Sequence, residues 1–419
     1  MPSADVLALI DKVGIGEFSD TTDLLNTKID LLQFKRMKKN GIIGIRDGAP
    51  PKPDESFSEF EPFDGTWKEH PIRIPKVQNI TERQDGNLIK TGDNIVSKSV
   101  DGNVIITKFW GNKRGISMGW DDNDLDLKAS LMRAGRTTEV VLDLQKFFAT
   151  FKNQLKEEIA YAIYNGKGVV NAVGSTTSPY NSNISGATPA LNNIEGMMNY
   201  LFDPDYDYGG LDISAYPFFR PKVLDFTSGT NADIAYLYTN INTRAKLISA
   251  TNSTTTNVPC ILDIIKRSID LMKRRYKKPE VGVISQKMFE LIQDAKESIV
   301  WSSSGVDEYV IKNVMEWMPG RDATVINGVP FIVDNNMMKM ETEEDATMIF
   351  PLNTIMLFSD VDKFHLCATK DSFKESAVEK VPGVWFQWIK TLYANTLFYV
   401  SPEARRGQCI IKLPTALGI

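Results

Sequence analysis

Histidine, cysteine and long apolar runs are scarce in this sequence of 419 residues. The two histidines, His70 and His365, each lie in a strand-like run, which argues against a histidine-based nucleophile or metal cluster. The three cysteines are far apart and odd in number, so they indicate buried thiols in a reducing compartment rather than a disulfide framework. No apolar run approaches about 18 residues, and no membrane-spanning segment is therefore expected.

The sequence also lacks the short motifs of common catalytic and cofactor sites. It has no Walker loop, dinucleotide glycine fingerprint, G-x-S-x-G or H-E-x-x-H. The acidic run 121–126 does not fit a calcium loop, because from Asp122 the sixth position is Leu127 rather than Gly. A helix cap by Asp121 or Asp122 explains it better. We therefore predict no catalytic residue, no cofactor and no bound metal.

Composition and charge are ordinary for a soluble globular protein. The net charge of -5 argues against a dedicated nucleic-acid binder, although the basic runs 35–39 and 273–278 could touch nucleic acid. Both runs end predicted helices, where cations complement the helix dipole, and this interpretation is favoured. The N-terminus has acids around a short apolar stretch and no basic region, so it predicts a cytoplasmic protein without a signal peptide.

One long amphipathic helix is predicted over residues 137–165, with Asn165 and Gly166 as its stop signal. Its large apolar side chains recur in steps of three and four and so share one face; the expected core positions are Leu144, Phe148, Phe151, Leu155 and Ile159. Fixing each backbone residue costs about 1–2 kcal/mol, so the helix needs a broad apolar partner. We expect that partner to be a β-sheet.

The first part of the chain reads as an arm followed by a hairpin. Helices are predicted at 6–13 and 22–39, ahead of a Pro- and acid-rich segment with too little apolar surface to fold alone. Two runs with alternating apolar residues, 96–100 and 104–109, flank Asp101-Gly102, which predicts a type I′ hairpin turn. Such a hairpin has little core of its own and is expected to rest on a neighbour.

The last part of the chain alternates between helices and strands. The pattern predicts helices at 260–276 and 286–296, and strands at 280–284, 324–326, 329–334, 354–358, 364–369, 384–399 and 408–413. Asn327-Gly328 marks a hairpin turn. The long strand 384–399 has apolar residues on both faces, with Lys390 as the exception on one of them.

Three stretches, taken in order, resemble the major capsid protein of tailed bacteriophages with the Hong Kong 97-type fold. The first runs from Trp120 through Gly135 to Gly166 and is similar to that family's entry into its spine helix. The second, 326–336 (INGVPFIVDNN), is similar to a strand–turn–strand of its axial domain. The third, 354–413, is similar to its returning peripheral strands and closing strand.

The resemblance implies an α+β fold of the Hong Kong 97 type. It assigns residues 1–64 to an N-terminal arm and residues 65–119 to an extended β-hairpin loop. It assigns residues 120–210 and 353–400 to a peripheral domain with the spine helix 137–165 on a β-sheet. It assigns residues 211–352 and 401–419 to an α/β axial domain. The hairpin would lie on an adjacent subunit, and the intersubunit residues would be Asp101, Gly102, Val104, Ile106 and Phe109.

The function implied is mechanical: hexamers and pentamers of the chain form an icosahedral shell around double-stranded DNA, which they contact non-specifically. The implied location is the virion capsid, assembled in the host cytoplasm without a membrane. Scaffolding, portal and decoration proteins are further partners left open, and no fused scaffolding leader is expected. An encapsulin-like compartment shares the fold. A cytosolic α/β enzyme with Asp, Glu, Lys or Ser on loops is the alternative from another class.

Overall fold

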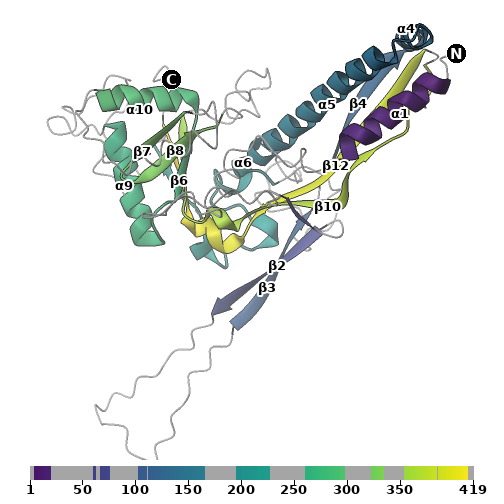
Figure 1. The fold of residues 1–419 in the computed structure, drawn as a ribbon. Helices are drawn as coiled ribbons and strands as arrows, with labels where there is room; N and C mark the ends of the chain where they lie inside the picture. Colours follow the sequence, from purple (N-terminus) through teal and green to yellow (C-terminus); the bar gives the residue numbers. More distant parts are fainter. Residues whose placement is uncertain are drawn as a thin grey trace, which may run out of the picture.

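The computed structural model describes residues 4–19, 60–62, 67–75, 102–110, 112–165, 195–226, 260–297, 322–334, 353–384 and 386–413. In these residues the strands form one sheet under a long helix, a second sheet with two further helices, and a hairpin that projects from the body (Figure 1). The α+β class expected from the sequence is confirmed. The predicted helix 22–39 and the turn residue Asp101 lie outside the described residues.

The long helix α5 (Thr137–Asn165) lies along a sheet whose central strand is β12 (Gln387–Val400). One edge of β12 pairs antiparallel with β4 (Asn112–Asp121). The other edge pairs with β10 (Phe364–Glu375) and with the short β11 (Glu379–Lys380), and β1 (Phe60–Pro62) adds in parallel to β10. This sheet is therefore assembled from segments far apart in the sequence.

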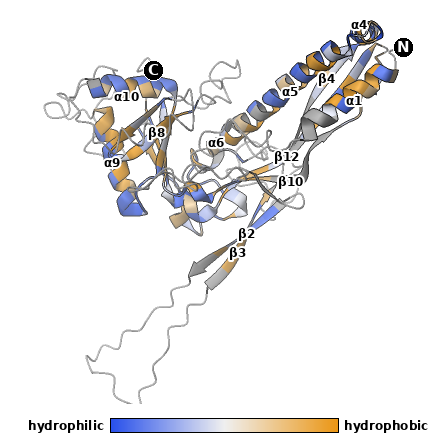
Figure 2. Ribbon diagram, in the orientation of Figure 1, coloured by the Kyte–Doolittle hydropathy of each residue, from blue (hydrophilic) through white to orange (hydrophobic). Residues whose placement is uncertain are grey.

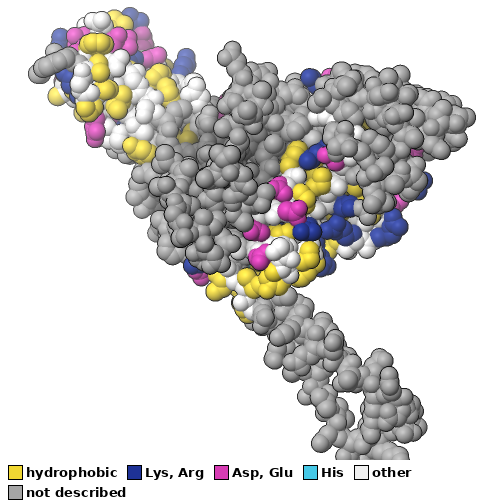
Figure 3. Space-filling model, turned by 180° about the vertical axis from the view of Figure 1, so that it is seen from behind, with side chains coloured by type: hydrophobic (Ala, Val, Ile, Leu, Met, Phe, Trp, Pro, Cys, Tyr) yellow, Lys and Arg dark blue, Asp and Glu magenta, His cyan; other side chains and the backbone are white. Residues whose placement is uncertain are grey.

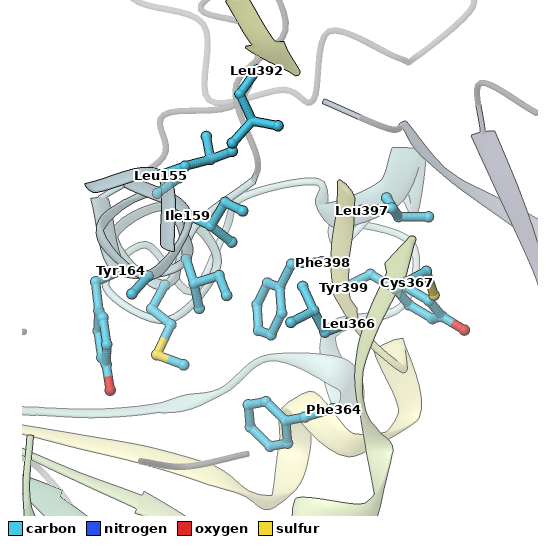
Figure 4. Packing of buried hydrophobic residues seen from close by; sticks show 14 of the residues in the cluster. Leu155, Ile159, Tyr164, Phe364, Leu366, Cys367, Leu392, Leu397, Phe398 and Tyr399 are labelled. Carbon is cyan, nitrogen blue, oxygen red and sulfur yellow. The ribbon is translucent and has the colours of Figure 1, made fainter. Parts of the chain in front are cut away.

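The apolar face of α5 is buried against that sheet. Leu144, Phe148, Leu155 and Ile159 are each at most 1% exposed, whereas Phe151 is partly buried at the margin of the same cluster. Figure 4 shows Leu155 beside Leu392 and Ile159 facing Phe398 on the strand β12. Each fully buried Leu, Ile or Phe stabilises the fold by about 1.5–3 kcal/mol, so packing on the sheet holds the helix.

Two further helices lie beside α5. Helix α4 (Asp122–Arg133) starts at Asp121, whose carboxylate accepts a hydrogen bond from the Asp124 backbone N–H at 2.7 Å, which confirms the helix-cap interpretation. Helix α1 (Ala4–Ser19) packs against α5, α4 and β10 through Val6, Ile10 and Val13. The chain thus begins its described part with a helix that packs on this sheet.

A buried ion pair joins α1 to the sheet. Lys390 of β12 is 1% exposed, and its Nζ lies 2.7 Å from Oδ1 of Asp11 on α1 and 3.0 Å from the Ser376 carbonyl oxygen. Asp11 also accepts a hydrogen bond from the Val378 backbone N–H. Lys390, the exception on the apolar face in the sequence, is therefore the residue that receives the N-terminal helix.

The second sheet has the strand order β5-β13-β9-β6-β8-β7. Its strands are β5 (Lys222–Asp225), β13 (Gln408–Lys412), β9 (Thr354–Phe358), β6 (Val281–Ile284), β8 (Val329–Val333) and β7 (Ala323–Ile326). One face packs on α9 (Ile261–Arg275) and α10 (Gln286–Glu297), whose apolar sides face it in Figure 2. The other face joins the core under α5 through Val283, Met356 and Ile410.

The turn between β7 and β8 has the conformation that its sequence predicts. Asn327 and Gly328 have φ values of 53° and 66°, the left-handed pair required by a type I′ turn. The predicted positions of α9, α10, β6, β7, β8 and β9 are likewise confirmed to within a few residues. The short elements between the sheets are α6 (Met197–Tyr200), η1 (Tyr208–Gly210), η2 (Pro217–Phe219), η4 (Val361–Lys363) and η5 (Pro402–Gly407).

The hairpin differs from the sequence prediction in its register. Strand β3 (Gly102–Trp110) pairs with β2 (Trp67–Pro75), and Gly102 stands opposite Pro75 in the last pair of this ladder. The predicted partner strand 96–100 lies outside the described residues. The predicted two-residue turn at Asp101-Gly102 is therefore wrong. Residues 112–119, assigned to the hairpin loop from sequence, belong to β4 and pair with β12. The remaining domain boundaries stay an expectation.

Candidate assembly surface

The hairpin β2–β3 presents an apolar outer face. Val104 and Ile106, two of the expected intersubunit residues, are 54% and 55% exposed, and Pro71, which stands opposite Ile106, is also exposed. On the same face Lys108 forms an ion pair with Glu69 at 3.2 Å. Exposed large apolar residues side by side on a projecting ribbon favour a contact with another protein surface.

The inner face of the hairpin packs on its own chain and includes Phe109. The Phe109 ring is 2% exposed and stacks on Tyr399 with centroids 4.8 Å apart, with Tyr208 at 5.0 Å. Phe109 is among the expected intersubunit residues, and its own subunit buries its ring, so the expectation for this residue stays untested. A Cβ on Gly209 would lie 2.6 Å from this ring, so the glycine makes room for it.

Apolar and polar contacts together attach the hairpin to the body. Ile72 and Ile105 pack on the segment 211–219. Within the hairpin the Thr107 hydroxyl donates to the His70 carbonyl oxygen at 2.9 Å. From there His70 Nε2 contacts the body, 3.1 Å from a carboxylate oxygen of Glu403. Burial raises the pKa of Glu403, but its hydrogen bonds and its interactions with the charges of His70 and Lys363 together outweigh this and leave the pKa below the usual value. The direction of the hairpin is thus set by its own subunit.

Both histidines of the chain lie at this attachment point. His365 stacks on Tyr399 with centroids 4.6 Å apart and hydrogen-bonds to the Ser401 hydroxyl at 3.2 Å, while His70 lies 6.0 Å from the same ring. These contacts give each histidine a structural role. Among the described residues no group of three or more His, Cys, Asp or Glu side chains is placed to hold a metal ion.

Sequence reasoning missed a buried cation beside this point. Arg405 of η5 is fully buried and donates to the carbonyl oxygens of Tyr206 and Tyr200 at 3.0 and 2.9 Å. Its guanidinium lies over the Tyr208 ring, and burial lowers its pKa to about 10. Arg405 thereby ties the loop after α6 to the segment between β12 and β13. In the sequence the only sign of this buried role is the position of Arg405 in the run Arg405-Arg406-Gly407.

Within the described part of the chain, no helix is both long enough and apolar enough to cross a bilayer.

Comparison with known proteins gives matches among solved structures. No family model matches the chain, and no curated protein matches it. The capsid asymmetric unit of cyanophage A-1(L) is similar over 85% of this chain and 90% of that chain, with 11% identity and a TM-score of 0.48. The capsid of a native GTA particle covers 85% and 88%, with 9% identity and a TM-score of 0.43.

A third structure, the procapsid of satellite phage P4 including its size determination protein, covers 84% of each chain at 12% identity, with a TM-score of 0.40. These structures have little sequence in common with this chain.

Proposed function

We propose that this chain is the major capsid protein of a tailed phage, and that it assembles into hexamers and pentamers of an icosahedral shell around double-stranded DNA. The observation that carries the proposal is the hairpin, whose outer face exposes Val104 and Ile106 while its inner face is fixed to the body. A hairpin that is held in one direction and has an apolar outer face is suited to packing against a neighbouring copy of the chain. The arrangement of spine helix, peripheral sheet and axial sheet supports the same proposal.

The proposal assigns a separate role to each part of the chain. The arm and the peripheral sheet with α5 form the body, the hairpin reaches the adjacent subunit, and the axial sheet lies toward the centre of the capsomer. The activity is mechanical rather than enzymatic. Its place is the virion capsid, after assembly in the host cytoplasm, and scaffolding, portal or decoration proteins would act as further partners.

The test is assembly of the purified full chain, followed by sedimentation and negative-stain electron microscopy. The wild-type chain is expected to give capsomers or shells, with interfaces above about 2,000 Å² that protect the hairpin from protease. Ile106→Asp should leave secondary structure and solubility normal and abolish assembly, because a carboxylate would enter an apolar contact. Ile106→Leu, which preserves volume and polarity, is the matched control. A compact wild-type monomer with a protease-resistant hairpin would refute the proposal.

A further inference from the structure

Cations from three separate elements converge at the end of α9. Arg275 is the last residue of that helix, Lys222 belongs to β5, and Arg406 belongs to η5. In the sheet Lys222 stands opposite Cys409, which follows Arg406 by three residues, and Arg275 Nη2 donates to the carbonyl oxygen of Arg220 at 2.7 Å, two residues before Lys222. The three side chains are thereby brought to one place. The Arg406 guanidinium is held 4.5 Å from the centroid of the Tyr276 ring.

The helix dipole explains only part of this arrangement. It accounts for Lys273, Arg274 and Arg275, which occupy the last turn of α9 and are exposed. It does not account for Lys222 and Arg406, which belong to other elements. Figure 3 shows Lys and Arg side chains gathered on the right-hand part of the face seen from behind. The structure therefore revises the interpretation of the basic run 273–278 as a helix end alone.

Placing like charges together costs free energy unless an anion offsets it. Burial lowers the pKa of Arg275, and Arg406 lowers it further. The thiol of Cys409 also acts on Lys222 and Arg275, but burial raises its pKa to about 12, so at pH 7 it is neutral. Lys277 forms ion pairs with Glu280 and Asp360 and does not belong to the group.

We infer that Lys222, Arg275 and Arg406, with Lys273 and Arg274 beside them, bind the phosphate groups of double-stranded DNA; this rests on the proposed function. Guanidinium groups match phosphate oxygens with paired N–H donors. Duplex DNA carries one charge per roughly 1.7 Å of its axis. An extended acidic peptide offers at most one charge per roughly 3.3–3.6 Å. Closely spaced cations are therefore better matched by the duplex.

The experiment measures binding of a fluorescein-labelled duplex to the purified full chain by anisotropy over a series of NaCl concentrations. The variant Arg275→Gln/Arg406→Gln is compared with Arg133→Gln/Arg136→Gln, which removes the same charge at the corner between α4 and α5. Each phosphate contact contributes about 0.9 to the slope of log K against log salt. The first pair should reduce the slope by roughly 1.8 and the control pair should leave it unchanged. Equal slopes in wild type and both variants would overturn the inference.

Further variants and competitors distinguish the loss of DNA binding from a folding defect, from binding of an acidic protein and from an assembly defect. Arg275→Lys/Arg406→Lys keeps the charges and should retain the slope. If the glutamine pair fails to fold, Lys222→Gln alone should lower the slope by about 0.9, and an unchanged slope refutes the inference. Polyglutamate that competes as well as DNA at equal charge would identify an acidic protein partner instead. Electron microscopy of the same preparations measures assembly separately. If the glutamine variants form shells and their salt slope equals that of the wild type, the DNA-binding inference is refuted and the proposed capsid function is not.

Discussion

The ion pair between Asp11 and Lys390 predicts an asymmetric response to mutation. Lys390 is 1% exposed and Asp11 is 34% exposed. Asp11→Asn removes the negative charge beside a buried ammonium, while the side-chain oxygen can still accept from the Val378 N–H. Removing one partner of a fully buried pair costs about 3–5 kcal/mol. Because Asp11 is a third exposed and partly screened by water, we expect a loss of about 2–3 kcal/mol here.

The reverse substitution should be tolerated. Lys390→Met replaces the buried cation with an apolar chain of similar length, and the Asp11 carboxylate left behind is a third exposed and can be solvated by water. We therefore expect a change within about 1 kcal/mol. Adding Asp11→Asn to Lys390→Met should then cost almost nothing further. Urea unfolding followed by tryptophan fluorescence measures all four proteins, and protease digestion reports whether α1 is released.

The changes in unfolding free energy of these variants test whether the ion pair attaches α1 to the sheet. If Asp11→Asn were as stable as wild type, Asp11 would not be offsetting a buried charge. If Asp11→Asn cost as much in the Lys390→Met background as in wild type, Asp11 would act through the Val378 N–H or through helix packing instead. Either result would refute the ion pair as the attachment of α1 to the sheet.

Three further outcomes are expected. Leu155→Ala, at a buried site on α5, should lower the unfolding free energy by about 2–5 kcal/mol, whereas Leu142→Ala, 52% exposed on the same helix, should change it by less than about 0.5; urea titration compares them. Gly282→Ala would place a Cβ 2.3 Å from an aromatic ring of β8 and should cost about 1–3 kcal/mol by the same assay, while Gly119→Ala, with its nearest contact at 3.7 Å, should be neutral. Cys409 has a pKa raised to about 12, so the folded state holds its proton longer than the unfolded state does; its stabilising contribution is complete below about pH 9 and is lost as the pH rises toward 12. Unfolding free energy measured from pH 8 to 10.5 should therefore fall less steeply in Cys409→Ala than in wild type, by about 1.4 kcal/mol per pH unit above 9, and parallel curves would contradict this.

Local patterns predicted those elements whose partners are close in sequence. The spine helix was evident because its apolar steps extend over many turns, and the β7–β8 turn was evident because Asn327-Gly328 directly joins two strands. The hairpin register was missed for the opposite reason. Asp101-Gly102 is a strong local turn signal, but Gly102 pairs with Pro75, and nothing in the local pattern of β3 specifies so distant a partner.

The attachment points were missed because they depend on tertiary packing. Asp11 and Lys390 are 379 positions apart, and the sequence marks only Lys390, as a lone cation on an apolar strand face. Phe109 carries no sign in the sequence that Tyr399 and Tyr208 will bury it. An alternating strand pattern tells which residues share a face, but not whether the chain itself or a second copy covers that face.

The order of strands in the second sheet has a consequence for folding. Strand β13, at 408–412, lies between β5 and β9, so an interior strand of this sheet comes from a segment far along the chain from β5, at 222–225. Until β13 pairs, β5 has no place in the sheet and the apolar edge of β9 stays open. Long-range pairing of this kind makes folding slow and exposes intermediates to aggregation.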